Sequence, residues 1–118
     1  SNMDKDRPIE EVCALLKSLL KDDTNQIIFC TGRVEDYREK TIEQIKKILK
    51  GSKNIDIDSC LYMRPQGDFR KDFMVKRDLY KRMIFDGFNP VIVFEDKITV
   101  VEMWKEMGLK CLRVTGAQ

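Results

Sequence analysis

The residues best suited to chemistry stand directly after short apolar runs. Thr31, Gly32 and Arg33 follow the run 27–30, which reads as a strand covered on both faces because its apolar residues do not alternate with polar ones. They offer a hydroxyl, a backbone open to close approach, and a guanidinium suited to phosphate. The first predicted strand therefore ends in groups that bind anions.

Two adjacent carboxylates, Glu95 and Asp96, follow a second unbroken apolar run at residues 91–94. Mg²⁺ commonly binds through one or two carboxylates together with a substrate phosphate. Capping of the next helix by acidic residues is an equally open interpretation of this pair.

A third set consists of Arg64, Asp72 and Lys76. Arg64 closes a predicted strand, and Asp72 and Lys76 are four residues apart at the start of a predicted helix, where a lysine is well placed for an anion. Hydroxyl, cations and carboxylates together predict phosphoryl chemistry with a divalent metal. Taken singly, Asp72 and Lys76 also fit an exposed ion pair, Thr31 and Gly32 fit a turn, and the arginines fit a solvated surface.

Periodicity and turn signals predict eight alternating elements. The predicted helices cover residues 7–21, 36–50, 72–84 and 99–107, and the predicted strands cover 27–30, 59–63, 91–94 and 110–114. Such alternation with short connections requires crossover helices, so we expect an α/β fold with a mainly parallel sheet and helices on both faces. Ligands of such sheets bind beyond the carboxyl ends of the strands, where all the candidates lie.

Composition sets wider limits. The 118 residues fit one compact domain, and a net charge of +2 gives no overall attraction to duplex nucleic acid. The chain has no histidine, which excludes histidine-based catalysis, and its four separated cysteines predict buried free thiols.

Without a membrane-length apolar stretch or a signal peptide pattern, we expect a cytoplasmic protein with no membrane partner. Ser1 and Asn2 resemble a tag remnant, so residues 1–6 are assigned to remnant and linker and 7–118 to the domain.

Three segments resemble a known family. Phe29-Cys30-Thr31-Gly32-Arg33 resembles the second motif of haloacid dehalogenase phosphatases, and the stretch from Arg64 to Lys76 is similar to the 3′-phosphatase part of phage polynucleotide kinase. Phe94-Glu95-Asp96-Lys97 resembles the acidic fourth motif, although Glu95 stands where the family usually has Asp. The resemblance covers nearly the whole chain from Pro8 onward.

The resemblance implies a three-layer, Rossmann-like fold and Mg²⁺-dependent removal of a phosphate from a nucleotide or a nucleic-acid 3′ end. It implies that Thr31 binds the phosphoryl group, Lys76 neutralises its charge and Asp72 orients the site. Gly32, Arg33 and Arg64 would contact the substrate, and Glu95 and Asp96 would hold Mg²⁺.

One part of the family pattern is missing. Members begin with a hydrophobic strand ending in Asp-x-Asp-x-Thr, whose first Asp attacks phosphorus. Asp4-Lys5-Asp6 has the spacing, but only three residues precede it. We therefore expect a chain that does not turn over alone.

In the family the missing strand is central. Without it, either the strands at 27–30 and 91–94 pair directly, giving the order 2-1-3-4, or a homodimer or partner chain supplies the strand. Direct pairing is the expectation, because a vacant position would leave backbone groups unpaired. A non-catalytic module that binds nucleic-acid ends or another protein is the alternative function.

Overall fold

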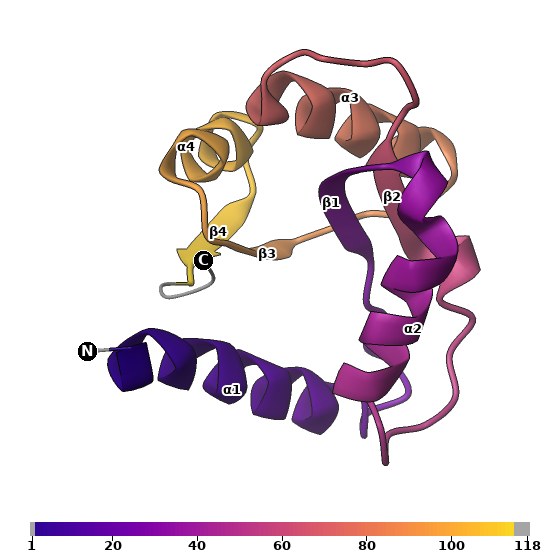
Figure 1. The fold of residues 1–118 in the computed structure, drawn as a ribbon, viewed down its shortest axis with the longest axis vertical. Helices are drawn as coiled ribbons and strands as arrows, with labels where there is room; N and C mark the ends of the chain where they lie inside the picture. The colour runs from indigo at the N-terminus through magenta and orange to yellow at the C-terminus, as the bar shows by residue number, and fades with distance from the viewer. Residues whose placement is uncertain (1, 115–118) are drawn as a thin grey trace.

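The computed structural model describes the backbone of residues 2–114 and the side chains of residues 10–114. Helices and strands alternate as predicted (Figure 1). The helices are α1 (Asn2–Leu19), α2 (Arg38–Ile48), α3 (Asp72–Phe85) and α4 (Ile98–Glu106), with 3-10 turns at Glu35–Tyr37 and Asp58–Cys60. The strands are β1 (Phe29–Val34), β2 (Leu61–Arg64), β3 (Ile92–Glu95) and β4 (Lys110–Arg113). The predicted α/β class is confirmed.

The first strand differs most from its prediction. It starts at Phe29 and runs to Val34, so Thr31, Gly32 and Arg33 lie inside the strand and not after it. The cause is pairing: Thr31 stands opposite Met63 and Val34 opposite Arg64, with a shift in register between them. The extra residues form a bulge of the kind that re-aims side chains beside functional sites.

Strand β2 shows how the layers form. Leu61 and Met63 point to one face and join a cluster with Ile45 and Leu49, at the α2 side. Tyr62 points to the other face and packs with residues of α3, as the alternation of side chains along a strand requires. Helices therefore cover both faces of the β1–β2 pair, as predicted.

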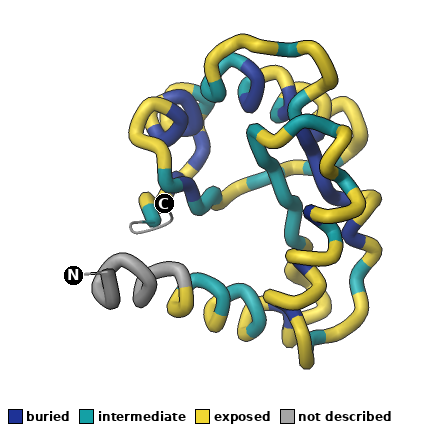
Figure 2. The backbone as a smooth tube through the Cα atoms, viewed as in Figure 1, coloured by how far each residue is buried: buried dark blue, intermediate teal, exposed yellow. Residues whose placement is uncertain are grey.

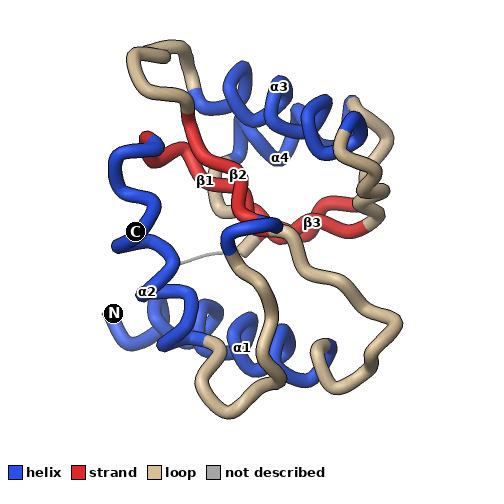
Figure 3. The backbone as a smooth tube through the Cα atoms, turned by 90° about the vertical axis from the view of Figure 1, so that its right-hand side faces the viewer, coloured by secondary structure: helices blue, strands red, loops and turns tan. Residues whose placement is uncertain are grey.

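Helix α4 packs on the β3–β4 pair. Val100, Val101 and Trp104 are buried against Cys111 of β4, with Val93 of β3 at the margin. Figure 3 shows α3 and α4 close together beyond the strands, and α1 at the opposite end of the molecule. Helix α1 begins at Asn2 and not at residue 7, so the backbone of Asp4 and Asp6 is helical; their side chains lie outside those described.

The expected single sheet is not found. Within residues 2–114, β1 pairs in parallel with β2 and β3 in parallel with β4, but β1 and β3 share no hydrogen bonds. Each keeps one unpaired edge. The prediction that the strand at 91–94 is covered on both faces is wrong. Strand β3 has only one neighbouring strand among the described residues and is only partly buried, and its first residue, Ile92, is 52% exposed (Figure 2).

The predicted glycines at the helix ends are confirmed. Gly51, Gly87 and Gly108 follow the ends of α2, α3 and α4, each with a positive φ that favours glycine. All four cysteines are free, although only Cys60 and Cys111 are fully buried. None of the helices in the described residues has the length and apolarity to cross a membrane.

Candidate functional site

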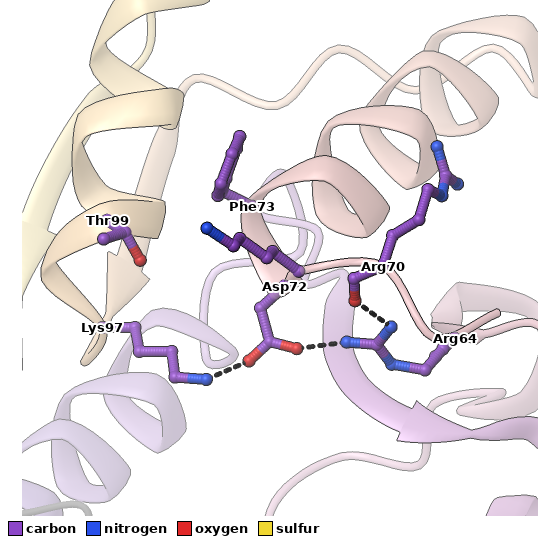
Figure 4. A pocket seen from close by; sticks show the side chains of 7 residues that line it. Arg64, Arg70, Asp72, Phe73, Lys97 and Thr99 are labelled. Carbon is purple, nitrogen blue, oxygen red and sulfur yellow. Dashed lines mark hydrogen bonds and ion pairs between the residues drawn. The ribbon is translucent and has the colours of Figure 1, made fainter.

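Asp72, the first residue of α3, is the centre of an ionic network. Its two carboxylate oxygens accept hydrogen bonds from different elements, one from Arg64 at the end of β2 and one from Lys97 ahead of α4. Figure 4 shows the carboxylate between the two cations. The network therefore ties the β1–β2 half of the molecule to the β3–β4 half.

The network fixes the protonation of Asp72. The hydrogen bond from Lys97 is the main cause that lowers the pKa of this carboxyl below its usual value, with further contributions from Arg64 and Lys76. Asp72 in turn raises the pKa of Lys97. Both groups are charged at neutral pH, so Asp72 is an anchor for cations and not a proton donor.

Gly32 allows this arrangement. A Cβ atom at this position would lie 2.7 Å from Oδ1 of Asp72, well inside van der Waals contact. The absence of a side chain therefore lets β1 approach the carboxylate that holds the two halves together.

Arg64 is largely occupied by the protein itself. Its Nε donates to the carbonyl oxygen of Gly32 at 2.8 Å, and Nη1 donates to the carbonyl oxygens of Asp68 and Arg70 at 2.9 and 2.6 Å. With the bond to Asp72, four of the five N–H donors of a guanidinium are used. The geometry thus gives Arg64 the task of holding the loop after β2.

A second ion pair is buried below the first. Nζ of Lys76 lies 2.9 Å from Oε1 of Glu95, and the two residues are 8% and 6% exposed. Trp104 donates its indole N–H to the same oxygen at 3.2 Å. Asp72 and Lys76 therefore do not form the exposed helix pair considered from the sequence; each is paired across the fold.

The other oxygen of Glu95 is also occupied. Oε2 accepts the backbone N–H groups of Asp96 and Lys97 at 3.1 and 3.3 Å. The capping interpretation is wrong for Glu95: both N–H groups precede the first residue of α4, Ile98, and the helix has no side-chain hydrogen bond at its N-cap residue Lys97 and no acidic residue in its first turn. A carboxylate with four hydrogen-bond donors has no lone pair left for a metal ion.

The fit to Mg²⁺ follows from this. The described residues contain no cluster of three or more acidic, cysteine or histidine side chains that could hold a metal. Asp96 is half-buried, and its carboxylate accepts no hydrogen bond from a described residue. Of the two adjacent acidic residues, it is therefore the one whose oxygens remain available to a metal ion. The described residues offer one ligand and do not form a magnesium site by themselves.

Thr31 and Arg33 diverge on β1. Thr31 is half-buried at the bulge, where its hydroxyl accepts the N–H of Arg33 at 3.2 Å. The Arg33 guanidinium turns to α2, where it donates to Gln44 at 2.7 Å and to Thr41 at 3.2 Å. Arg33 thus contacts a surface other than the Asp72 network.

The structure brings most of the predicted residues to one edge of the strands. Arg64 binds both Gly32 and Asp72, and Asp72 also binds Lys97. Lys97 stands two residues after Glu95, which is paired with Lys76. Two members were missed. Lys97 had a signal, since it directly follows the two carboxylates. Trp104 lies among buried apolar residues of α4, and its signal is that a buried indole N–H usually needs an acceptor.

A body of helices and short parallel strand pairs is compatible with the fold of haloacid dehalogenase-like phosphatase domains. Residues 1–118 match the model of the family described as polynucleotide kinase PNKP phosphatase domain. The chain belongs to this family.

A protein of the Autographa californica nuclear polyhedrosis virus is also similar. It is described as a putative bifunctional polynucleotide kinase/RNA ligase, and it is 33% identical over 84 residues, which make up 70% of this chain and 11% of the viral protein. The chain thus spans about a tenth of this relative. The similarity supports the phosphatase-domain assignment.

Proposed function

We propose that this domain is the phosphate-binding body of a Mg²⁺-dependent polynucleotide 3′-phosphatase, and that it turns over only when a further strand carrying an aspartate nucleophile lies between β1 and β3. The observation that supports it most is that β1, which carries Thr31, and β3 each have one unpaired edge among the residues that the structure describes. A parallel strand there would join both pairs into one sheet, in the order β2, β1, added strand, β3, β4.

In this proposal Lys76 stabilises the charge of the transferring phosphoryl group. Its ammonium has three N–H donors, and among the described residues Glu95 accepts from one of them. The buried position strengthens its attraction to an anion, because little water screens it. Glu95 and Trp104 hold the lysine in place and are positioning residues.

Thr31 supplies a hydroxyl to the same phosphoryl group, and Asp96 would be one ligand of a Mg²⁺ ion, which would neutralise charge on the phosphate. The added aspartate attacks phosphorus, the bond to the 3′ oxygen of the nucleotide breaks, and a second acidic group protonates that oxygen. Water then hydrolyses the aspartyl-phosphate. Asp72 acts by fixing Arg64 and Lys97.

The test adds a strand. An apolar segment ending in Asp-x-Asp-x-Thr is fused ahead of α1, and phosphate release from a 3′-phosphorylated oligonucleotide is measured with Mg²⁺. The matched control carries Asn in place of the first Asp of the added segment. We expect release with the Asp segment, and none from the control or from the unextended chain.

Robust turnover by the unextended chain would overturn this proposal, and its loss in Asp4→Asn would assign the nucleophile to α1. A non-catalytic module for nucleic-acid ends is the second candidate, favoured by the saturated hydrogen bonding of Glu95. It predicts phosphate binding with no turnover even after the strand is added.

A further inference from the structure

The four hydrogen bonds of Glu95 decide what this carboxylate can bind. Oε1 accepts from Nζ of Lys76 at 2.9 Å and from the indole N–H of Trp104 at 3.2 Å, and Oε2 accepts two backbone N–H groups. A divalent ion would have to displace the ammonium of Lys76, and it would leave that cation unpaired in a position that is 8% exposed, where an unpaired charge is costly. Lys76 is therefore the built-in cation of Glu95.

Asp96 alone offers little to a divalent ion. Mg²⁺ demands near-octahedral coordination by oxygen atoms, and the described residues contain no group of three or more side chains that could hold a metal. The backbone carbonyl of Asp96 is also occupied, because Nε of Arg113 donates to it at 3.4 Å. The acidic pair therefore resembles a metal site in the sequence but does not form one in the described part of the chain.

The charges around the acidic pair favour a phosphate without a metal. The cationic side chains that contact the acidic residues, or share a pocket with Asp72, outnumber the carboxylates: they are Arg64, Lys71, Lys76, Lys97 and Arg113, against Asp72, Glu95 and Asp96. Arg70 lines the same pocket and is paired with Asp68 and Asp78 outside it. A phosphate group carries a charge of about −1.5 to −2 near pH 7, so the excess of positive charge attracts it directly.

We infer that this domain binds phosphate without a metal ion, and that Glu95 is the counter-ion of Lys76 and not a metal ligand. Two of the three N–H donors of Lys76 have no acceptor among the described residues, so the lysine is able to hold Glu95 and an anion together. The inference rests on the proposed function, because the terminal phosphate is assigned there to Lys76. It limits any need for Mg²⁺ to turnover, for which the added strand would supply the missing ligands.

Calorimetry with inorganic phosphate tests this inference. Phosphate is titrated into the unextended chain in the presence of EDTA and, separately, in the presence of excess Mg²⁺, and Mg²⁺ is also titrated alone. We expect the two dissociation constants for phosphate to agree within about threefold, and the Mg²⁺ titration to give no saturable heat. The inference is overturned if phosphate binds only with Mg²⁺, or if Mg²⁺ tightens its binding by more than about threefold.

Asp96→Asn provides an independent arm, and Glu106→Gln is its matched control for the loss of one negative charge. Glu106 is exposed and is the last residue of α4, whereas Asp96 precedes that helix. Without a metal between Asp96 and the ligand, removal of the Asp96 charge removes a repulsion and should tighten phosphate binding about threefold relative to the control. Binding in Mg²⁺ that is no tighter than that of Glu106→Gln would contradict the inference.

Lys76→Met and the chain with the added strand separate this inference from the proposed function. If phosphate binds only with Mg²⁺ and its binding is lost in Lys76→Met, the proposed function stands and the inference fails. If phosphate binds without Mg²⁺ and depends on Lys76, but the extended chain releases no phosphate, the inference stands and the proposed function fails. Thr31→Val, which leaves the Lys76–Glu95 pair in place, takes the place of Lys76→Met if that variant does not fold.

Discussion

The buried pair of Lys76 and Glu95 gives the sharpest prediction about stability. Lys76→Met keeps most of the apolar stem of the side chain and removes its charge, which leaves Glu95 buried at 6% exposure with three donors in place of four. Breaking a buried pair by removing one partner typically costs about 3–5 kcal/mol, because the remaining charge loses its compensation. Since the indole and two backbone N–H groups still bind Glu95, we expect about 3 kcal/mol for this variant.

The chain contains its own reporter for this measurement. Its one tryptophan, Trp104, is buried and hydrogen-bonded to Glu95, so its fluorescence follows unfolding at the pair itself. Urea titrations give the free energy of unfolding for the native chain, Lys76→Met, Glu95→Gln and the double variant. Lys81→Met, at an exposed position of α3, is the control, with an expected change within about 0.5 kcal/mol.

The double variant should cost less than the sum of the single changes, with a coupling of about 1–3 kcal/mol for residues in direct contact. Additive costs, or a cost of Lys76→Met no larger than that of Lys81→Met, would refute the view that these two charges hold each other in the interior.

Three further outcomes are expected. Gly32→Ala should destabilise the fold by about 1–3 kcal/mol in urea titrations, because the new Cβ meets the carboxylate of Asp72. Asp72→Asn should lower the free energy of unfolding by about 1 kcal/mol at pH 7; since the folded state lowers the pKa of this carboxyl, the difference persists above about pH 4 and disappears as the pH falls toward the folded pKa. In thiol labelling at pH 8, Cys13 should react first, because burial raises the pKa of Cys30 to about 12 and also raises the pKa of Cys60 and Cys111.

Each outcome has a control within the chain. Gly32→Ala in an Asp72→Ala background should cost little, and an undiminished cost there would place the clash elsewhere. A stability difference for Asp72→Asn that grows as the pH falls below 4 would contradict the sign of the pKa shift. Fast labelling that survives Cys13→Ser would show that a cysteine other than Cys13 is accessible.

The sequence was sufficient to predict the order and type of the elements, because helical periodicity, apolar runs and terminal glycines agreed. Pairing was harder to predict. The extension of β1 through Gly32 depends on its partner β2, and the separation of β1 from β3 depends on tertiary packing, which no local pattern encodes. Direct pairing of β1 with β3 was expected because unpaired backbone N–H and C=O groups are costly, but in the described residues each of these two strands has one unpaired edge.

The sequence indicated most of the residues that belong to the candidate site, but not what each contact does. Strand ends gather at one edge of parallel strands, and the structure pairs two strand-end residues with residues of α3: Arg64 with Asp72, and Glu95 with Lys76. Sequence spacing could not reveal that Arg64 is occupied by carbonyl oxygens or that Glu95 is saturated, because these bonds depend on the exact course of the backbone after each residue and on distant partners such as Gly32 and Lys76.

Calorimetric titration of a 3′-phosphorylated oligonucleotide and its 3′-hydroxyl counterpart tests the central claim most directly. The account predicts that the terminal phosphate adds affinity and that this increment is lost in Lys76→Met and in Thr31→Val. Equal affinities for the two ligands in the native chain, or an increment that both variants retain, would contradict it.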